Sequence, residues 1–212
     1  MSAVRIIAGR WRGRTIKAPT GDVTRPTTDR VRESWASTVT SLLYDTGFEG
    51  LRVLDPFAGS GALGLEALSR GAAHVVFCER DRRVRGLLRE NIAGLEGAAS
   101  LSTLLATDSL TARGGELLRQ HGPFDLVVLD PPYAYPAERI AGLLYGLITA
   151  GALASRALIS YEHRAEGDSD ALAAYLIARG LSGEDSPCVF QMVSCKDYGS
   201  TRIAYFCYES GF

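Results

Sequence analysis

The sequence predicts an α/β fold with a doubly wound, mostly parallel sheet that ends in an antiparallel hairpin. From residue 51 onward, short apolar runs alternate with segments of helical periodicity, the pattern of parallel strands joined by right-handed crossovers. A glycine-rich turn joins the first of these strands to the first helix, as expected at a ligand-binding end of such a sheet. The last two strand-like runs are separated by four turn-type residues, so we expect them to pair as a hairpin.

A short region precedes the alternating part. Polar and apolar residues alternate over residues 5–17, and Gly9 and Gly13 are candidate turn or bulge points. This pattern predicts a small β-hairpin or ribbon. A loop over residues 19–26 then leads to a helix over residues 29–44, whose apolar residues recur at helical spacing. Thr27 or Thr28 is the candidate N-cap of this helix.

The alternating elements form the main domain. The predicted strands cover residues 51–55, 74–79, 101–106, 124–130 and 157–161. The predicted helices cover residues 62–70, 81–93, 110–121, 136–149 and 170–179, and the closing hairpin covers residues 189–195 and 201–208. We therefore divide the chain into a basic N-terminal arm, residues 1–28, and one domain, residues 29–212, that begins with the lead-in helix.

Composition excludes several classes of protein. A chain of 212 residues with 46% hydrophobic residues can bury a large core, and its apolar runs are too short to span a membrane. No signal peptide is recognisable at the start. The four cysteines form no Cys-x-x-Cys pair, so we expect buried, reduced thiols rather than disulfides or metal ligands. These features predict a cytoplasmic protein without a metal, and we expect a monomer.

Positive charge is concentrated near the N-terminus. Between Arg5 and Arg32 there are eight basic and two acidic residues, whereas the rest of the chain has 15 basic and 22 acidic ones. Such an arm favours contact with a polyanion, because neutralising phosphates supplies most non-specific affinity for nucleic acids. A solvated charged hairpin is the alternative. Trp11, which lies between Arg10 and Arg12, favours nucleic acid because an aromatic ring among arginines can stack on a base.

The glycine-rich loop at residues 55–64 predicts a cofactor site. Gly59 and Gly61 permit a tight turn and a close approach to a ligand at the amino end of a helix. With Gly64, and with Glu79 placed 20 residues after Gly59, the loop also matches a dinucleotide fingerprint. A nicotinamide or flavin enzyme is therefore one interpretation of this loop.

Acidic residues favour S-adenosylmethionine over a dinucleotide. Asp55 precedes the loop, where a carboxylate would attract the ammonium group of this cofactor and repel a pyrophosphate. Glu79 would bind the ribose, unless it is a surface acid at a strand end. Asp108 follows the third strand and would accept a hydrogen bond from the adenine amine, unless it caps the next helix. The closing hairpin is also foreign to the six-stranded dinucleotide fold.

The tetrapeptide Asp130-Pro131-Pro132-Tyr133 follows the fourth predicted strand. Its two prolines stiffen the turn and remove two N–H donors, so the Asp130 carboxylate and the Pro131 carbonyl can both accept hydrogen bonds from one substrate amine. Tyr133 offers a ring for stacking on a planar group. The alternative is a strand that ends in a rigid turn, but the position at a carboxyl strand end favours an amine site.

Four segments, taken in order, resemble the RsmD-like 16S ribosomal RNA guanine-N2 methyltransferases. They are residues 5–14, residues 25–34, the loop at residues 55–71 and the tetrapeptide at residues 130–133. The resemblance implies a seven-stranded S-adenosylmethionine-dependent methyltransferase fold. It also implies methylation of the exocyclic N2 amine of a guanine in the 16S rRNA of the small ribosomal subunit, with S-adenosylhomocysteine as the second product and no metal.

The resemblance also assigns roles to residues. The residues implied to bind the cofactor are Asp55, Phe57, Gly59, Ser60, Gly61, Glu79 and Asp108. Asp130 and Pro131 would hold the amine and Tyr133 would flank the base. The residues implied to bind RNA are Arg10, Trp11, Arg12, Arg14, Arg25 and Arg30. The match is looser in the closing segment.

Three other functions stay open. A DNA adenine-N6 methyltransferase would use the same amine site, but the chain lacks a separate target-recognition domain. A nicotinamide-dependent oxidoreductase is disfavoured by Asp55, and an inactive RNA-binding module by the intact Asp130. Two residues are equally open: Asp29 could close over the site or pair with a nearby arginine, and His163 could be a base or a polar surface residue.

Overall fold

The computed structural model describes residues 2–19, 28–43, 46–166, 170–181 and 188–210. The chain forms two compact units, Met1–Asp108 and Ser109–Phe212. The predicted boundary at residue 28 follows residues outside the described ranges, and it stays a prediction.

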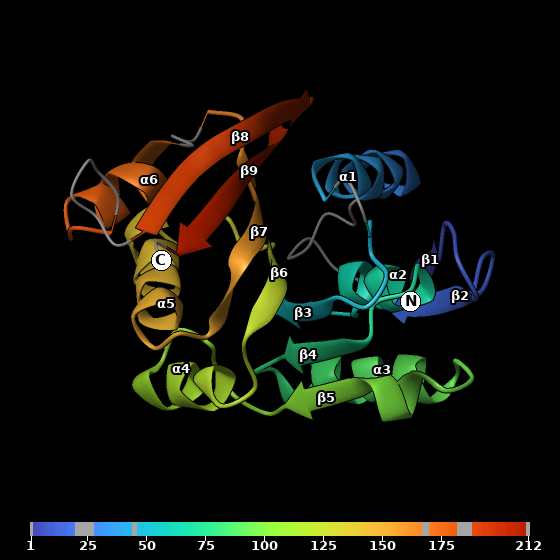
Figure 1. The fold of residues 1–212 in the computed structure, drawn as a ribbon. Coiled ribbons are helices and arrows are strands. Elements are labelled where there is room, and N and C mark those ends of the chain that lie inside the picture. Colours follow the sequence, from blue (N-terminus) through green and yellow to red (C-terminus); the bar gives the residue numbers. More distant parts are fainter. Residues whose placement is uncertain (1, 20–27, 44–45, 167–169, 182–187, 211–212) are drawn as a thin grey trace. The chain divides into compact units, whose positions relative to one another are not determined.

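The described part of the first unit contains a parallel sheet of three strands in the order β5-β4-β3 (Figure 1). These strands are β3 (Arg52–Asp55), β4 (His74–Cys78) and β5 (Ser102–Leu105). Helices α2 (Ala62–Ser69) and α3 (Arg82–Ala93) connect them, and a 3₁₀ turn, Ala98–Leu101, precedes β5. β3 and β4 read as near-continuous apolar runs because they are buried: Val53, Val75 and Phe77 are each 0% exposed. The residues of β5 are half-buried.

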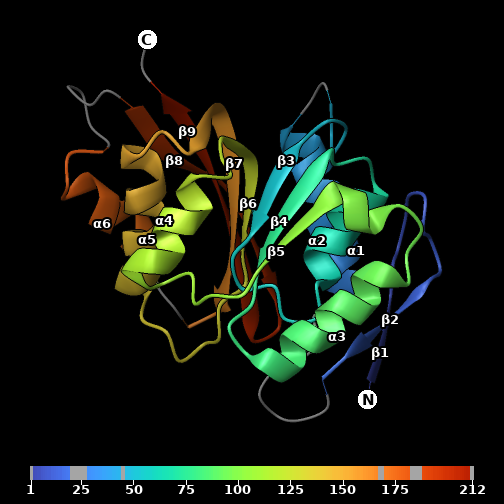
Figure 2. The ribbon, with the colours of Figure 1, turned by 90° about the horizontal axis from the view of Figure 1, so that it is seen from below.

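The basic arm forms a hairpin in the same unit. Strand β1 (Ser2–Arg5) pairs antiparallel with β2 (Thr15–Ala18), as predicted. Gly9 and Gly13 lie in the connecting turn with φ values of +83° and +82°, which only glycine adopts without strain. Figure 2 shows this hairpin beside α2 and α3.

Helix α1 (Asp29–Leu42) follows the arm. The Val31 N–H donates to the Thr28 side chain, which identifies Thr28 as the N-cap and decides an alternative that the sequence left open. Trp35, 1% exposed, packs against Phe48 with ring centroids 5.6 Å apart. These contacts attach the lead-in helix to the first unit.

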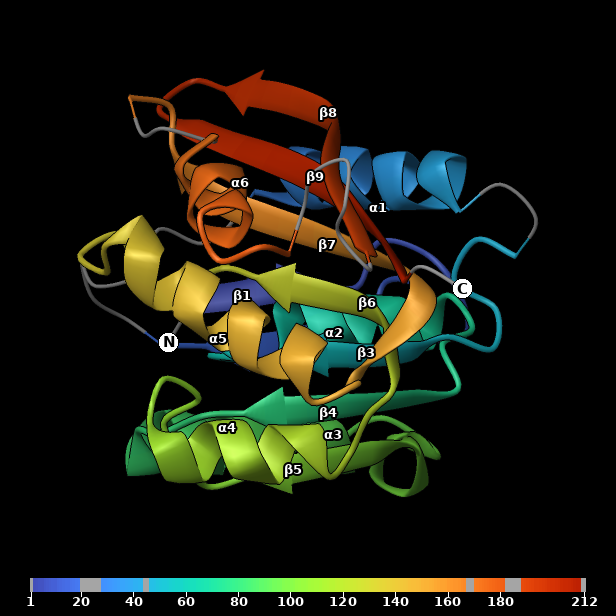
Figure 3. The same ribbon diagram turned by 60° about the vertical axis from the view of Figure 1, so that its left-hand side comes forward.

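The described part of the second unit has four strands in the order β6-β7-β9-β8. They are β6 (Phe124–Leu129), β7 (Leu153–Arg164), β8 (Cys188–Tyr198) and β9 (Thr201–Ser210). β6 and β7 are parallel, whereas β9 is antiparallel to both β7 and β8. The helices are α4 (Ala112–Arg119), α5 (Ala137–Thr149) and α6 (Asp170–Ile177), and α5 and α6 lie side by side (Figure 3).

The predicted elements are confirmed within the described residues, but some details differ. β7 was predicted over residues 157–161 and is longer, because β9 pairs with it from Arg156 to Arg164. β8 was predicted over residues 189–195 and is also longer, because it pairs with β9 as far as Tyr198. Cys195 was predicted to be buried and is exposed, because it lies on the exposed face of β8. Cys78 and Cys188 are buried and unbonded, as predicted, whereas Cys207 is unbonded but only half-buried. The described residues include no helix that is long and apolar enough to cross a bilayer.

Candidate active site

The glycine-rich loop begins where β3 ends. Asp55, the last residue of β3, is 2% exposed, and Gly61 is the N-cap of α2 with φ +84°. A Cβ on Gly61 would lie 2.4 Å from Cδ1 of Leu88, so the Leu88 side chain would have to move. Glycine is favoured at this position both by the backbone conformation and by the close approach of Leu88.

Three backbone N–H groups of this loop are already engaged. The Gly59 N–H donates to Glu79 Oε2 at 3.0 Å, and the Ala58 N–H donates to the Cys78 carbonyl at 3.1 Å. The Gly61 N–H donates to the Ala58 carbonyl at 2.7 Å. A dinucleotide loop offers such groups to a pyrophosphate. The observed pattern therefore disfavours a dinucleotide at this site.

Glu79 connects the loop to the start of α3. Its second carboxylate oxygen accepts the Asp81 N–H at 2.7 Å, and Asp81 caps α3. Burial raises the pKa of Glu79 above its ordinary value, while these two backbone hydrogen bonds act in the opposite direction. A carboxylate has about four acceptor positions, so Glu79 can still accept from a ligand hydroxyl.

Three carboxylates gather at the ends of β3, β4 and β5. Burial, assisted by Glu79, Asp108 and Asp55, raises the pKa of the Cys78 thiol to about 12. The space next to the Gly59 Cα is open, since a Cβ built on this residue would meet nothing closer than the Phe57 carbonyl oxygen at 4.0 Å. An open position within a negative field suits a cation-bearing ligand better than a phosphate. The residues present therefore fit S-adenosylmethionine.

Asp108 does not cap the next helix. Thr111 is the N-cap of α4 and accepts the Gly114 N–H at 3.0 Å. Asp108 pairs instead with Arg80, at 3.1 Å between Nη1 and Oδ2, and its side chain is 24% exposed. The alternative that the sequence left open for Asp108 is removed, and its adenine-binding role stays a prediction. Phe57 and Ser60 are both half-buried in the loop.

The candidate amine site lies at the end of β6 in the second unit. Asp130 follows the strand directly, and burial raises its pKa from 3.8 to about 6. Pro131 is buried, and the Tyr135 N–H donates to the Pro132 carbonyl at 2.9 Å, which closes the turn. The predicted acceptor residues are therefore held on a short, rigid turn.

Tyr133 is fixed by residues of β7 and β9. Its hydroxyl lies 2.9 Å from Thr201 Oγ1 and donates to Glu162 Oε1 at 3.3 Å. The guanidinium carbon of Arg164 lies 5.3 Å from the ring centroid. In the register of β7 and β9, these three residues share one face of the sheet, since Arg164 pairs with Thr201. Tyr133 is 38% exposed, so part of the residue is accessible to a ligand.

His163 lies on the other face of β7 from Glu162, because successive side chains of a strand alternate. It is 7% exposed, its ring stacks on Tyr161 at 4.9 Å, and its Nδ1 lies 2.7 Å from the Arg164 carbonyl. This placement points His163 away from the face that holds Tyr133. It favours a structural role over that of a base.

The predicted RNA-binding residues fall into two groups. Arg10, Arg12, Arg14 and Arg30 are exposed. Trp11 is 6% exposed and donates from Nε1 to the Glu96 carbonyl at 3.1 Å, which favours packing over base stacking. Arg25 lies outside the described residues.

Asp29 forms two ion pairs at the start of α1. Its Oδ2 lies 3.1 Å from Arg5 Nη2, and its Oδ1 lies 2.8 Å from Arg32 Nη2. Arg32 is 1% exposed and also donates to the Arg5 carbonyl at 2.6 Å. Asp29 therefore attaches α1 to β1, in agreement with the arginine-pairing alternative.

Two buried residues of α2, both missed in the sequence, attach the arm. Glu66, 0% exposed, accepts the Ile7 N–H at 2.7 Å and the Ala8 N–H at 3.1 Å. Ser69 accepts the Trp11 N–H at 3.0 Å and donates to the Ala8 carbonyl at 2.6 Å. The sequence does contain a signal for Glu66, which is the single charged residue within the apolar helix at residues 62–69. A charge that is buried needs hydrogen-bond partners, so this residue could have been expected to bind another segment.

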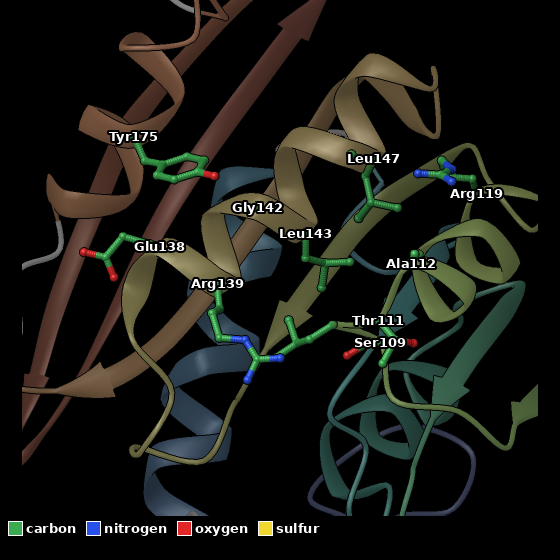
Figure 4. Close-up of a pocket in the computed structure, with 13 residues that line it drawn as sticks. Ser109, Thr111, Ala112, Arg119, Glu138, Arg139, Gly142, Leu143, Leu147 and Tyr175 are labelled. Atoms are coloured by element: carbon green, nitrogen blue, oxygen red, sulfur yellow. The ribbon is translucent and has the colours of Figure 1, made fainter.

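A separate pocket of about 420 Å³ lies among α4, α5 and α6 in the second unit. Figure 4 shows Arg139 and Arg119 at opposite ends of it, with Leu143 and Leu147 on α5. None of its 13 lining residues was predicted for the site. Within the described residues, no group of three or more His, Cys, Asp or Glu side chains is arranged to hold a metal ion.

Comparison with known proteins gives close relatives. The family model described as Conserved hypothetical protein 95 matches residues 4–191. The Ribosomal RNA small subunit methyltransferase D of Escherichia coli strain K12 is 40% identical over 168 residues, which cover 77% of this chain and 76% of that protein. The same-named protein of Haemophilus influenzae is 38% identical over 142 residues, 66% of this chain and 70% of that protein.

Solved structures match over nearly the whole chain. The putative methyltransferase yhhF from Escherichia coli aligns with a TM-score of 0.72 and 33% identity over 99% of both chains. A magnesium protoporphyrin IX methyltransferase from Synechocystis, solved with bound S-adenosylmethionine, aligns with a TM-score of 0.62 over 92% of this chain and 86% of that one. At 19% identity the second match concerns the fold alone.

Proposed function

The chain belongs to the family described as Conserved hypothetical protein 95, the RsmD-like methyltransferases, and we propose that it methylates the exocyclic N2 amine of a guanine in 16S rRNA. Membership in this family and the S-adenosylmethionine-dependent methyltransferase fold confirm the resemblance predicted from the sequence. The RNA substrate, the guanine and the donor S-adenosylmethionine are parts of the proposal. The names of the relatives from Escherichia coli and Haemophilus influenzae specify the small-subunit ribosomal RNA, and this supports an RNA substrate.

The observation that carries the proposal is the arrangement of Asp130 and Tyr133. The Asp130 carboxylate ends a buried strand, and the Tyr133 ring is held within three residues of it by Thr201 and Glu162. An acceptor beside a partly open aromatic ring fits a planar heterocycle that carries an amine. A guanine presents such an amine.

Each residue has a distinct task in this chemistry. The lone pair of a guanine N2 is delocalised into the ring, so the amine is a poor nucleophile. Asp130 and the Pro131 carbonyl would accept its two N–H groups and favour pyramidal geometry as the new bond forms, an interaction that strengthens toward the transition state. Tyr133 would orient the base for in-line attack. When bound, S-adenosylmethionine supplies an already activated methyl group.

The cofactor side of the proposal rests on the first unit. Asp55 would bind the ammonium group, Glu79 the ribose and Asp108 the adenine amine, with Phe57, Gly59, Ser60 and Gly61 lining the loop. The engaged loop N–H groups support this ligand over a dinucleotide. For the RNA, the exposed Arg10, Arg12 and Arg14 supply the charge for phosphate contact.

A methyl-transfer assay tests the proposal. Tritiated S-adenosylmethionine is incubated with small ribosomal subunits, naked 16S rRNA or double-stranded DNA, and the labelled nucleoside is identified by mass spectrometry. We expect N2-methylguanosine from one of the RNA substrates and no label with Asp130→Ala. Labelled N6-methyladenosine from DNA would instead support the DNA enzyme. Tight NADH binding without S-adenosylhomocysteine binding would support an oxidoreductase.

A further inference from the structure

We propose that Asn91 is a positioning residue that links the basic arm to the cofactor loop, so that the two binding sites strengthen each other. Asn91 lies on α3 and is 5% exposed. The hydrogen bonds that its side chain forms in the described part of the chain go to Lys17 and Ser60, and neither of these is predicted to bind RNA. The link itself rests on contacts of the first unit, and its meaning for RNA rests on the function proposed above.

The Asn91 side chain forms three hydrogen bonds to two distant segments. Its Oδ1 accepts the Lys17 N–H at 2.9 Å, and its Nδ2 donates to the Lys17 carbonyl at 2.8 Å. The same Nδ2 donates to the Ser60 carbonyl at 2.9 Å. Lys17 belongs to β2 of the arm and Ser60 lies between the two loop glycines. One amide thus holds the backbones of the arm and of the cofactor loop at once.

The chemistry of this contact requires a carboxamide. A single side chain must accept from one N–H and donate to two carbonyls, and only an amide offers an acceptor and two donors in one plane. Reversing the amide would place its oxygen against two carbonyl oxygens, so the hydrogen bonds define its orientation. Asn91 is the only asparagine in the sequence.

Helix α3 supports the loop at two further points. Leu88, one turn before Asn91, occupies the space that a Cβ on Gly61 would need, at 2.4 Å. At the start of the helix, Glu79 accepts from both the Asp81 N–H and the Gly59 N–H. A displacement of α3 would therefore change the loop along its length, and Asn91 transmits such a displacement to the arm.

Other hydrogen bonds and ion pairs that hold the described part of the arm go to residues outside the loop. Glu66 and Ser69 bind residues 7, 8 and 11 from α2, and Glu90 pairs with Lys17 Nζ at 2.8 Å. Both side chains of the Lys17–Glu90 pair are exposed, so the pair contributes little to the stability of the arm. Glu90 is next to Asn91, contacts the same arm residue and forms no hydrogen bond with Ser60. It offers a matched control.

Two measurements on the full chain test the link. The first is amide hydrogen exchange of residues 15–18 with and without S-adenosylhomocysteine. The second is calorimetric affinity for S-adenosylhomocysteine with and without a 16S rRNA transcript. Both are applied to the wild type, Asn91→Ala, Asn91→Asp and the control Glu90→Gln. Asn91→Asp preserves the volume and the acceptor for Lys17 but removes both donated hydrogen bonds, so it remains informative if Asn91→Ala folds poorly.

In the wild type and in Glu90→Gln, we expect the ligand to slow exchange of residues 15–18 about fivefold, and we expect the RNA to raise ligand affinity by about the same factor. In both Asn91 variants, the slowing of exchange by the ligand and the gain in ligand affinity from the RNA should each fall below about twofold. Ligand affinity without RNA should fall by about 5- to 30-fold, the loss of one or two buried hydrogen bonds.

The outcomes separate this inference from the proposed function. No slowing in the wild type, or equal slowing in all four proteins, would overturn the link. Loss of slowing in Glu90→Gln as well would assign the effect to arm attachment in general and would also overturn it. Slowing that depends on Asn91 in a protein that binds no RNA would support the link and overturn the RNA substrate.

Discussion

The Gly59 N–H donates a hydrogen bond to Oε2 of Glu79 at 3.0 Å, so a carboxylate already accepts an N–H group of the kind that a dinucleotide loop offers to a phosphate. The same glutamate also binds the Asp81 N–H at the start of α3. One side chain therefore braces the loop, contributes to its negative potential and connects the loop to the start of α3. This relationship explains how a dinucleotide-like glycine pattern can serve a different cofactor.

Glu79→Ala should weaken S-adenosylhomocysteine binding by about 10- to 100-fold, because the Gly59 N–H loses its hydrogen-bond acceptor and the ribose hydroxyls lose theirs. Isothermal titration calorimetry measures this change. Glu96→Ala removes an exposed glutamate from the same unit and should leave the affinity within about twofold. An unchanged affinity in Glu79→Ala would assign Glu79 to the fold alone.

Asp130→Asn should remove turnover but stabilise the protein at neutral pH. The pKa of Asp130 is raised to about 6 by burial, from 3.8, so the folded chain holds a proton that the unfolded chain releases between these values. Stability from the protonated carboxyl is therefore present below about pH 4 and lost as the pH rises through about 6. At pH 8 we expect Asp130→Asn to be more stable by about 1–3 kcal/mol.

Urea unfolding at pH 4, 6 and 8 measures this difference, which should shrink toward pH 4. In the wild type, kcat/KM should rise with pH up to about 6 and then level, because an ionised acceptor is required. Cofactor affinity of Asp130→Asn should stay within about tenfold of the wild type, since the carboxylate acts on the amine. Equal losses of turnover and cofactor affinity would place Asp130 in the cofactor site instead.

Tyr133→Phe should lower kcat/KM by about 3- to 10-fold while keeping the ring. It removes the hydroxyl that bonds to Thr201 and Glu162, and the ring is then less firmly oriented. Thr201→Val removes the partner of the same hydroxyl. A double-mutant cycle of methyl-transfer rates should show non-additive effects, with the double variant close to the worse single variant. Additive effects would show that Thr201 does not act through Tyr133.

Replacing Arg10, Arg12 and Arg14 together with glutamine should weaken RNA binding and flatten its salt dependence. Each lost phosphate contact on single-stranded RNA removes about 0.7 from the slope of log K against log salt concentration, so the slope should fall by up to about 2. Filter binding at several salt concentrations measures the slope. The control replaces Arg113, Arg156 and Arg179, which are exposed in the second unit, and should leave it unchanged.

Gly9→Ala and Gly13→Ala should differ in stability although their φ values match. Both positions have φ near +82°, which costs an alanine about 1 kcal/mol or more. A Cβ on Gly9 would lie 1.8 Å from the Ser69 carbonyl oxygen, whereas on Gly13 it would meet nothing within 4 Å. Thermal unfolding should show the larger loss for Gly9→Ala, by about 2 kcal/mol or more. Equal losses would show that the arm does not pack on Ser69.

Much of the fold was predictable because its signals are local. Apolar periodicity and glycine turns identified the strands and helices within a few residues, as β3, α2 and β6 illustrate. The length of β7 was not predictable, because pairing with β9 extends it beyond its apolar run. The burial of Trp11 was also missed, since its carbonyl partner at Glu96 lies 85 residues away.

The sequence by itself determined which functional groups the protein carries and in what local setting. They are a strand followed by Asp130-Pro131, a glycine loop flanked by acidic residues, and an arm rich in arginine. Tertiary structure decided which polar side chains hold these parts. Asn91, Glu66 and Thr201 bond to partners between 31 and 74 positions away. A buried polar group must find a partner, but which backbone reaches it depends on how the chain has folded.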